Sequence, residues 1–161
     1  MKQIKAIITG VAHVSTSGIE GALTIENQLE TIIQHYFFGT SHEKRAVFKS
    51  IVLDSDWCSF AAKRKLITYI SDEQNLLEGR AKNDFDKLMR DVMSIRNAFA
   101  HGKFSSDDKR VWLSYFEGKP RNKELSDDYL TEVETFLRRG FDSVFQLSVK
   151  IGATKRTEST A

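Results

Sequence analysis

The strongest constraint on the fold is a regular amphipathic pattern in the middle of the chain. Between residues 83 and 100, apolar side chains recur at the three- and four-residue spacing of one helix face: Phe85, Leu88, Met89, Val92 and Phe99. A half-buried strand would instead alternate apolar and polar residues. We therefore predict a long amphipathic helix over residues 83–100, and this helix favours an all-α fold.

The same period predicts further helices, which makes about five in all. Gly39 is a plausible stop for the first of them, Ser41 an N-cap for the second, and Ser126 an N-cap for the last. The last helix also has two aspartates in its first turn, the sign of charge favoured there. The predicted spans, besides 83–100, are residues 19–38, 42–53, 57–70 and 127–150.

The period changes after KFSSDDK, residues 103–109. RVWLSYF, EGKPRN and KEL then follow one another, and the single proline of the chain falls in the middle segment. Two short apolar or mixed runs around a proline-containing turn are typical of a β-hairpin. We expect an all-α bundle of about five helices with a small hairpin before the last helix.

The two ends of the chain are set apart from this bundle. In residues 1–18 the isoleucines have helical spacing, Thr9-Gly10-Val11 also suits a strand, and Ser15 to Gly18 indicate a break, so the fold of this segment stays open. Residues 152–161 are polar and predict a disordered tail. The predicted organisation is an N-terminal segment, 1–18, a helical domain, 19–151, and the tail.

Composition narrows the class of protein. The chain has 161 residues, 40% of them apolar and 29% charged, which suits one globular domain, and its net charge of +2 permits nucleic acid as a partner without demanding it. One cysteine, Cys58, excludes an internal disulfide and fits a reducing compartment. The four scattered histidines give no zinc spacing, so we expect neither a metal nor a cofactor. Without a signal peptide or a membrane-spanning apolar run, a cytoplasmic protein is expected.

Arg96 interrupts the apolar stripe of the helix predicted over residues 83–100. It comes one turn after Val92, and a charge in such a place must be paired, because an isolated buried charge costs many kcal/mol. Glu26 and Glu30 interrupt the stripe of the first predicted helix with the opposite sign. We therefore expect a buried ion pair between Arg96 and Glu26 or Glu30, which either fixes the register of two helices or holds the arginine in a site.

His101 follows Arg96 by five residues, and Gly102 comes next. On an unbroken helix, residues five apart point about 140° away from each other. The two side chains converge on one phosphate only if the helix ends between them, and Gly102 is a natural residue for such an ending. The alternative is that His101 makes only a favourable contact with the dipole at the end of the helix.

These residues resemble the defining motif of the HEPN superfamily. Arg96-Asn97-x-x-x-His101 has the form R-x4-H, with a polar residue directly after the arginine, at the end of a long helix. GALTIENQLETIIQHYF resembles the family's first helix with its inward acidic residue, and SFAAKRKLITYI resembles a segment of some branches. A hairpin followed by LSDDYL is similar to proteins like the mannitol operon repressor. The similarity covers Ile19 to Ile151.

The resemblance implies an activity and a role for each residue. Catalytic members are metal-independent endoribonucleases, among them toxins, defence factors and RNA-processing factors, and they work as dimers whose motifs meet at the interface. His101 would then serve as general acid–base for attack by the ribose 2′-OH, Arg96 would stabilise the charge on the phosphate, and Asn97 would orient either group. Glu26 or Glu30 would hold Arg96. The partners implied are RNA, a second copy and a separate antitoxin or regulatory protein.

Other members of the superfamily cleave nothing. The alternative function is therefore a regulatory module that resembles the mannitol operon repressor and acts through a nucleic acid, a nucleotide or a protein. Lys103, Lys109 and Arg110 follow the motif and are candidates for a phosphate path. The basic run 63–65, beside Trp57, is either an RNA track or, in the interpretation we favour, a set of partly solvated charges next to core residues.

Overall fold

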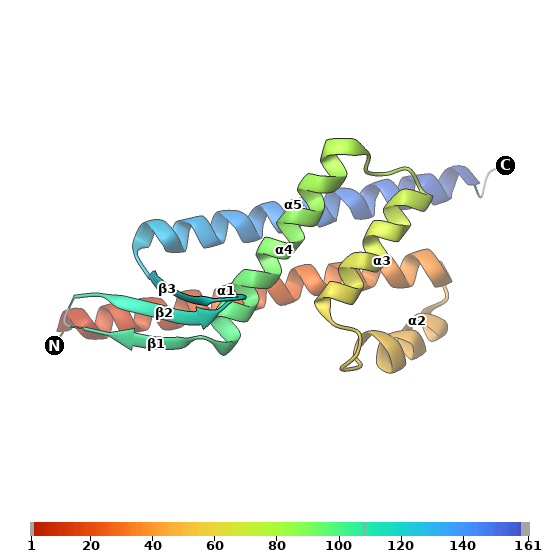
Figure 1. The fold of residues 1–161 in the computed structure, drawn as a ribbon. Helices are drawn as coiled ribbons and strands as arrows, with labels where there is room; N and C mark the ends of the chain where they lie inside the picture. Colours follow the sequence, from red (N-terminus) through yellow and green to blue (C-terminus); the bar gives the residue numbers. More distant parts are fainter. Residues whose placement is uncertain (1, 108, 159–161) are drawn as a thin grey trace. The chain divides into compact units, whose positions relative to one another are not determined.

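The computed structural model describes the backbone of residues 2–107 and 109–158, and the side chains of residues 16, 18–107 and 109–152. Most of these residues are helical, so the predicted mainly α-helical class is confirmed (Figure 1). In the described part of the chain, no helix is long and apolar enough to cross a membrane. The elements are α1 (Lys2–Phe38), α2 (His42–Phe48), the π-helical segment η1 (Lys49–Leu53), α3 (Phe60–Glu73), α4 (Gly79–His101), β1 (Lys103–Ser106), β2 (Val111–Phe116), β3 (Pro120–Glu124) and α5 (Asp127–Glu158).

The first and last helices are longer than predicted. α1 continues without interruption through Ser15 to Gly18, so the predicted break there is wrong. Gly18 is buried inside the helix, and a Cβ there would make an ordinary van der Waals contact of 3.5 Å with a ring carbon of Phe99 of α4. α5 continues past the expected end near Lys150 as far as Glu158, and residues 159–161 of the expected tail lie outside the described residues.

The segment before α5 is a three-stranded antiparallel sheet in the order β1-β2-β3, where the sequence predicts a hairpin. The predicted hairpin corresponds to β2 and β3, and β1 pairs with the other edge of β2, with Lys103 opposite Ser114 and Ser106 opposite Val111. All four residues of β1 are exposed. β1 therefore lacks the alternation of apolar and polar residues that predicts a half-buried strand.

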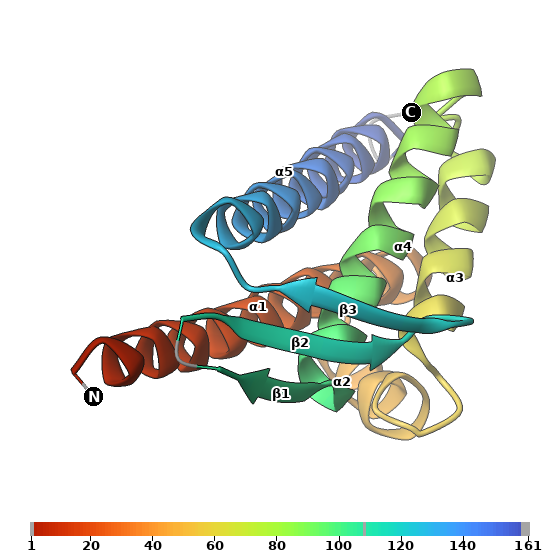
Figure 2. The same cartoon turned by 60° about the vertical axis from the view of Figure 1, so that its left-hand side comes forward.

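The described residues divide into two compact units. The first contains α1 up to Leu23 and the chain from Asp91 to Arg139, which includes the end of α4, the sheet and the start of α5. Within this unit the sheet lies beside α1 and the end of α4 (Figure 2). A Cβ at Gly102 would lie 2.4 Å from Leu113 Cδ1 and 2.3 Å from the carbonyl oxygen of Ala98. Only glycine therefore fits where the chain leaves α4 and enters β1.

The second unit contains the chain from Thr24 to Arg90 and the part of α5 from Gly140 onward. Its core joins apolar faces of α1, α3, α4 and α5, as the helical periodicity predicts. One charged side chain, Lys63, is buried on the core face of α3. The fully buried apolar side chains of this unit include Ile25, Leu29, Ile33, Ile67, Ile70, Met89, Val144 and Ile151.

Candidate functional site

The predicted motif lies at the C-terminal end of α4. The helix runs unbroken through His101, and it ends only there, with the N–H of Gly102 donating to the carbonyl oxygen of Ala98 at 2.8 Å. Gly102 therefore follows the end of α4, as the sequence suggests, but no helix end lies between Arg96 and His101, so the condition for the two side chains to converge on one phosphate is not met. On the continuous helix the directions of the two side chains differ by about 140°.

Asn97 lies on the same face of α4 as His101 and is hydrogen-bonded to Arg96. Asn97 and His101 are one turn apart, so they share a face of α4, and both are exposed. Arg96 is half-buried, and its Nη1 donates a hydrogen bond to Oδ1 of Asn97 at 3.0 Å. The guanidinium therefore leans toward the face that carries His101. His101 itself makes no hydrogen bond or ion pair with any other described residue, which leaves its imidazole available to a ligand.

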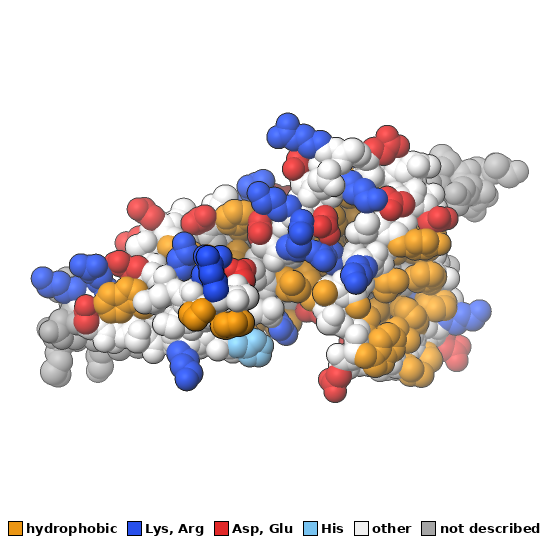
Figure 3. Space-filling model, in the orientation of Figure 1, with side chains coloured by type: hydrophobic (Ala, Val, Ile, Leu, Met, Phe, Trp, Pro, Cys, Tyr) orange, Lys and Arg blue, Asp and Glu red, His pale blue; other side chains and the backbone are white. Residues whose placement is uncertain are grey.

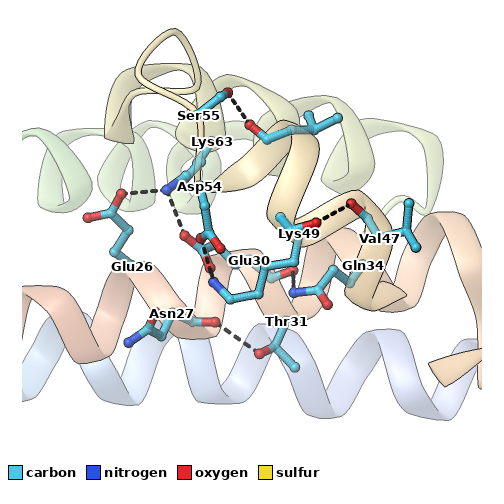
Figure 4. A network of polar contacts seen from close by, with 12 residues as sticks. Glu26, Asn27, Glu30, Thr31, Gln34, Val47, Lys49, Asp54, Ser55 and Lys63 are labelled. Carbon is cyan, nitrogen blue, oxygen red and sulfur yellow. Dashed lines mark hydrogen bonds and ion pairs between the residues drawn. The ribbon is translucent and has the colours of Figure 1, made fainter. Parts of the chain in front are cut away.

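The ion pair predicted between Arg96 and Glu26 or Glu30 is wrong. Lys63 Nζ donates to Glu26 Oε1 at 2.7 Å and to Glu30 Oε1 at 2.6 Å. The second oxygen of Glu30 accepts a hydrogen bond from Lys49 of η1. Figure 4 shows the lysine side chains pointing at these carboxylates of α1. Two lysines thus provide the positive charge that we had assigned to the arginine.

Two members of this cluster are buried, and their burial bears on whether Lys63 stays charged. Lys63 is 5% exposed and Glu30 is 4% exposed. Burial of the ammonium by itself lowers the pKa of Lys63, but the hydrogen bonds and negative charges of Glu26 and Glu30 outweigh it, so the pKa is raised. Lys63 therefore stays charged, and the interpretation of the basic run 63–65 as partly solvated is wrong for this residue. The cluster holds α1 to α3 and does not position Arg96.

Lys63 was not among the residues predicted to pair with Glu26 or Glu30, although the sequence contains a signal for it. Phe60, Ile67 and Ile70 define the buried face of α3, and Lys63 follows Phe60 by three residues, on the same face. Lys49 had no such signal, because it lies at the junction of α2 with a π-helical segment, where the helical period changes. A charge on a core face of α3 was thus predictable, and its partner was not.

Cys58 lies beside this cluster and is a buried free thiol. Burial raises the pKa of the Cys58 thiol, and the nearby positive charge of Lys63 only partly opposes this effect. Since the thiolate is the reactive form of cysteine, a protonated buried thiol does not serve as a nucleophile. Among the residues with described side chains, no group of three or more histidine, cysteine, aspartate or glutamate residues is arranged to hold a metal ion.

The three cations that follow the motif are not brought together. Lys103 begins β1 directly after α4, whereas Lys109 and Arg110 lie in the turn at the other end of that strand. The carboxylate of Asp107 accepts hydrogen bonds from the N–H groups of both turn residues at 2.8 Å, and these bonds lower the pKa of Asp107. Arg110 also pairs with Glu124 at 3.7 Å. Lys103 is therefore the one member of this predicted trio placed near His101.

Comparison of the chain with protein-family models, with curated proteins and with solved structures gave no match. The chemistry of the end of α4 therefore rests on its geometry: an exposed imidazole, an amide one turn away, a guanidinium held by that amide, and one lysine at the start of the next strand. An imidazole exchanges protons near neutral pH, and a guanidinium binds phosphate oxygens. This combination is suited to a phosphodiester.

Proposed function

We propose that the chain is a metal-independent endoribonuclease of the HEPN type, with His101, Arg96 and Asn97 as its site. The observation that carries the proposal is the exposed face of α4, where His101 has no described partner and Asn97 holds the guanidinium of Arg96. A structural histidine would be expected to donate to or accept from the protein. A proton-transfer group must instead be free to reach its substrate.

In the proposed reaction, His101 takes the proton of a ribose 2′-OH. The resulting oxygen nucleophile attacks the adjacent phosphorus, the bond from phosphorus to the 5′ oxygen breaks, and that oxygen takes up a proton as it leaves. The products are a 2′,3′-cyclic phosphate and a free 5′-hydroxyl. Arg96 donates to the non-bridging oxygens and stabilises the charge that develops on them. Asn97 keeps the guanidinium on the reacting side.

A second copy of the chain belongs to this proposal. Because Arg96 and His101 of one helix differ in direction by about 140°, one copy does not surround a phosphate from two sides. Asn97, Ala100 and His101 are all exposed at the end of α4, so this face is open to the same face of another copy. Two motifs that meet there would provide one imidazole as base and the other as acid.

The chemistry is tested with a paired substrate. A single-stranded RNA is incubated with the purified protein in EDTA, beside the same oligonucleotide with a 2′-deoxy nucleotide at the mapped cleavage position. We expect cleavage of the all-ribose strand to continue in EDTA and to leave cyclic phosphate ends, and the substituted position to stay intact, because the nucleophile is missing. Cleavage at the 2′-deoxy position, or loss of all cleavage in EDTA, would contradict the mechanism.

A second candidate function, a non-catalytic module that binds a protein, is favoured by a different observation. Phe38, α2 and η1 line an apolar groove of about 460 Å³, beside which Val47 is 52% and Ile51 66% exposed. Figure 3 shows apolar side chains gathered over α2, at the lower right of the view. Contiguous exposed apolar surface is typical of protein-contact sites. As a module of this kind alone, the protein would bind a partner and leave the RNA intact in EDTA.

A further inference from the structure

A small pocket in the first unit is separate from the motif at the end of α4. It lies between α4, the sheet and the start of α5, and its volume is about 250 Å³. Three aromatic side chains line it: Tyr115, Tyr129 and Phe136. Pockets for drug-sized molecules have volumes of about 300–1,000 Å³. This pocket therefore suits a single small headgroup.

The charges around the pocket are mostly negative. Asp91 of α4 and Glu132 of α5 also line it. Burial raises the pKa of Tyr129 to about 12, and the negative charges of Glu132 and Glu117 contribute to the same shift. The tyrosine hydroxyl thus stays neutral, and the potential around it favours a cation.

A lysine side chain already places a positive charge at this pocket. Lys123 of β3 also lines the pocket, and its Nζ lies 5.9 Å from the centre of the Tyr129 ring, which is within the range of a cation–π interaction. The Lys123 side chain is exposed, and its ammonium forms no ion pair with any described residue. The ring of Tyr129 therefore attracts a positive group that reaches the pocket on a flexible stem.

We propose that this pocket binds a small organic cation with an alkylated ammonium headgroup. Aromatic rings attract such a group by cation–π interactions, and the carboxylates of Asp91 and Glu132 balance its charge. A hard metal ion is a poorer match, because Ca²⁺ and Mg²⁺ need six or more oxygen ligands and half of this lining is apolar or aromatic. In the absence of the ligand, the ammonium of Lys123 lies over the Tyr129 ring, and it competes with the ligand for this ring.

The test is a titration of the full chain, followed by backbone amide resonances, with choline and with its neutral isostere 3,3-dimethylbutan-1-ol. Choline is expected to shift the resonances of Asp91, Tyr129 and Glu132 in a saturable way and to bind at least about tenfold more tightly than the alcohol, because only choline carries the charge. Lys123→Ala is expected to tighten choline binding several-fold by removing the competing cation. Glu132→Gln should weaken it.

The matched control is Glu134→Gln, an exposed acid on the same helix that does not line the pocket. It should leave choline affinity unchanged. Equal affinity for choline and the alcohol, no saturable shift with choline, or a Lys123→Ala variant that binds choline less tightly than the native chain would each overturn the proposal. Because Lys123, Glu132 and Glu134 are all exposed, these substitutions are expected to leave the fold intact.

Discussion

Lys63→Met is expected to lower the free energy of unfolding by about 3–5 kcal/mol. The ammonium of Lys63 is buried and bonded to both Glu26 and Glu30, so its removal leaves carboxylates inside the protein without their main partner. Each kcal/mol corresponds to about 2–4 °C in melting temperature for a chain of this size. Thermal and urea unfolding at neutral pH measure the change. Lys65→Met, an exposed neighbour on α3, is the control and should stay within about 0.5 kcal/mol of the native chain.

Two further measurements test why Lys63→Met loses stability. Adding Glu26→Gln and Glu30→Gln to Lys63→Met should recover part of the stability, because the stranded charges are then gone. The raised pKa of Lys63 means that its contribution is complete below the unfolded-state pKa, about 10.4, and is lost as the pH rises through the higher folded-state value. The difference between the native chain and Lys63→Met should thus narrow in strongly alkaline solution. If Lys63→Met is as stable as Lys65→Met, the cluster of Lys63, Glu26 and Glu30 contributes nothing to the free energy of unfolding.

Arg96→Ala is expected to slow RNA cleavage by about 10²–10³-fold, the usual cost of removing one donor to a developing oxyanion. The same substitution should change the free energy of unfolding by no more than about 1 kcal/mol, since the bond given to Arg96 in the structure joins it to its neighbour Asn97 and not to a buried carboxylate. Cleavage rate and melting temperature are measured on the same preparation. Arg90→Ala, an exposed arginine on the same helix, is the matched control.

The two readouts separate the possible roles of Arg96. A structural arginine would produce a large fall in melting temperature, comparable to that of Lys63→Met, and any loss of cleavage would follow from unfolding. A phosphate-binding arginine loses activity at unchanged stability. Native cleavage by a well-folded Arg96→Ala variant would remove the arginine from the proposed site.

The sequence predicted helix bounds and caps well where neighbouring residues determine them. The span predicted for residues 42–53 coincides with α2 and η1 together, and Gly39 ends α1 with a φ of +55°. The hydroxyl oxygen of Ser126 accepts a hydrogen bond from the N–H of Tyr129 at 3.3 Å, which confirms the predicted cap of α5. These features depend on residues within one turn of each other. β1 was missed because its pairing partner, β2, determines it and its own exposed residues do not.

The pairing of charges was the part that the sequence could not determine. The apolar stripe of α1 correctly indicated a charged side chain, Glu30, on its core face, yet a stripe carries no information about which distant side chain meets it. Arg96 of α4 is instead half-buried and hydrogen-bonded to Asn97. Lys63 and the two cations that follow it are interpreted alike from the sequence, as partly solvated charges next to core residues, which does not distinguish the buried one. The positions of Arg96, Asn97 and His101 on one helix were predictable, but their relative directions depended on where α4 ends. At that end only glycine fits, because a Cβ at Gly102 would lie 2.4 Å from Leu113 Cδ1 of the sheet.

The most direct test of the proposed nuclease is the rate of RNA cleavage in EDTA by the native chain and by His101→Ala, measured side by side. General acid–base catalysis contributes about 10²–10⁴-fold, so the variant should lose that much activity. Its melting temperature should not change, since His101 is exposed and has no described partner. His42→Ala, an exposed histidine of α2, should cleave at the native rate. Equal cleavage by the native chain and His101→Ala, or none by the native chain, would contradict the assignment of the end of α4 as a ribonuclease site.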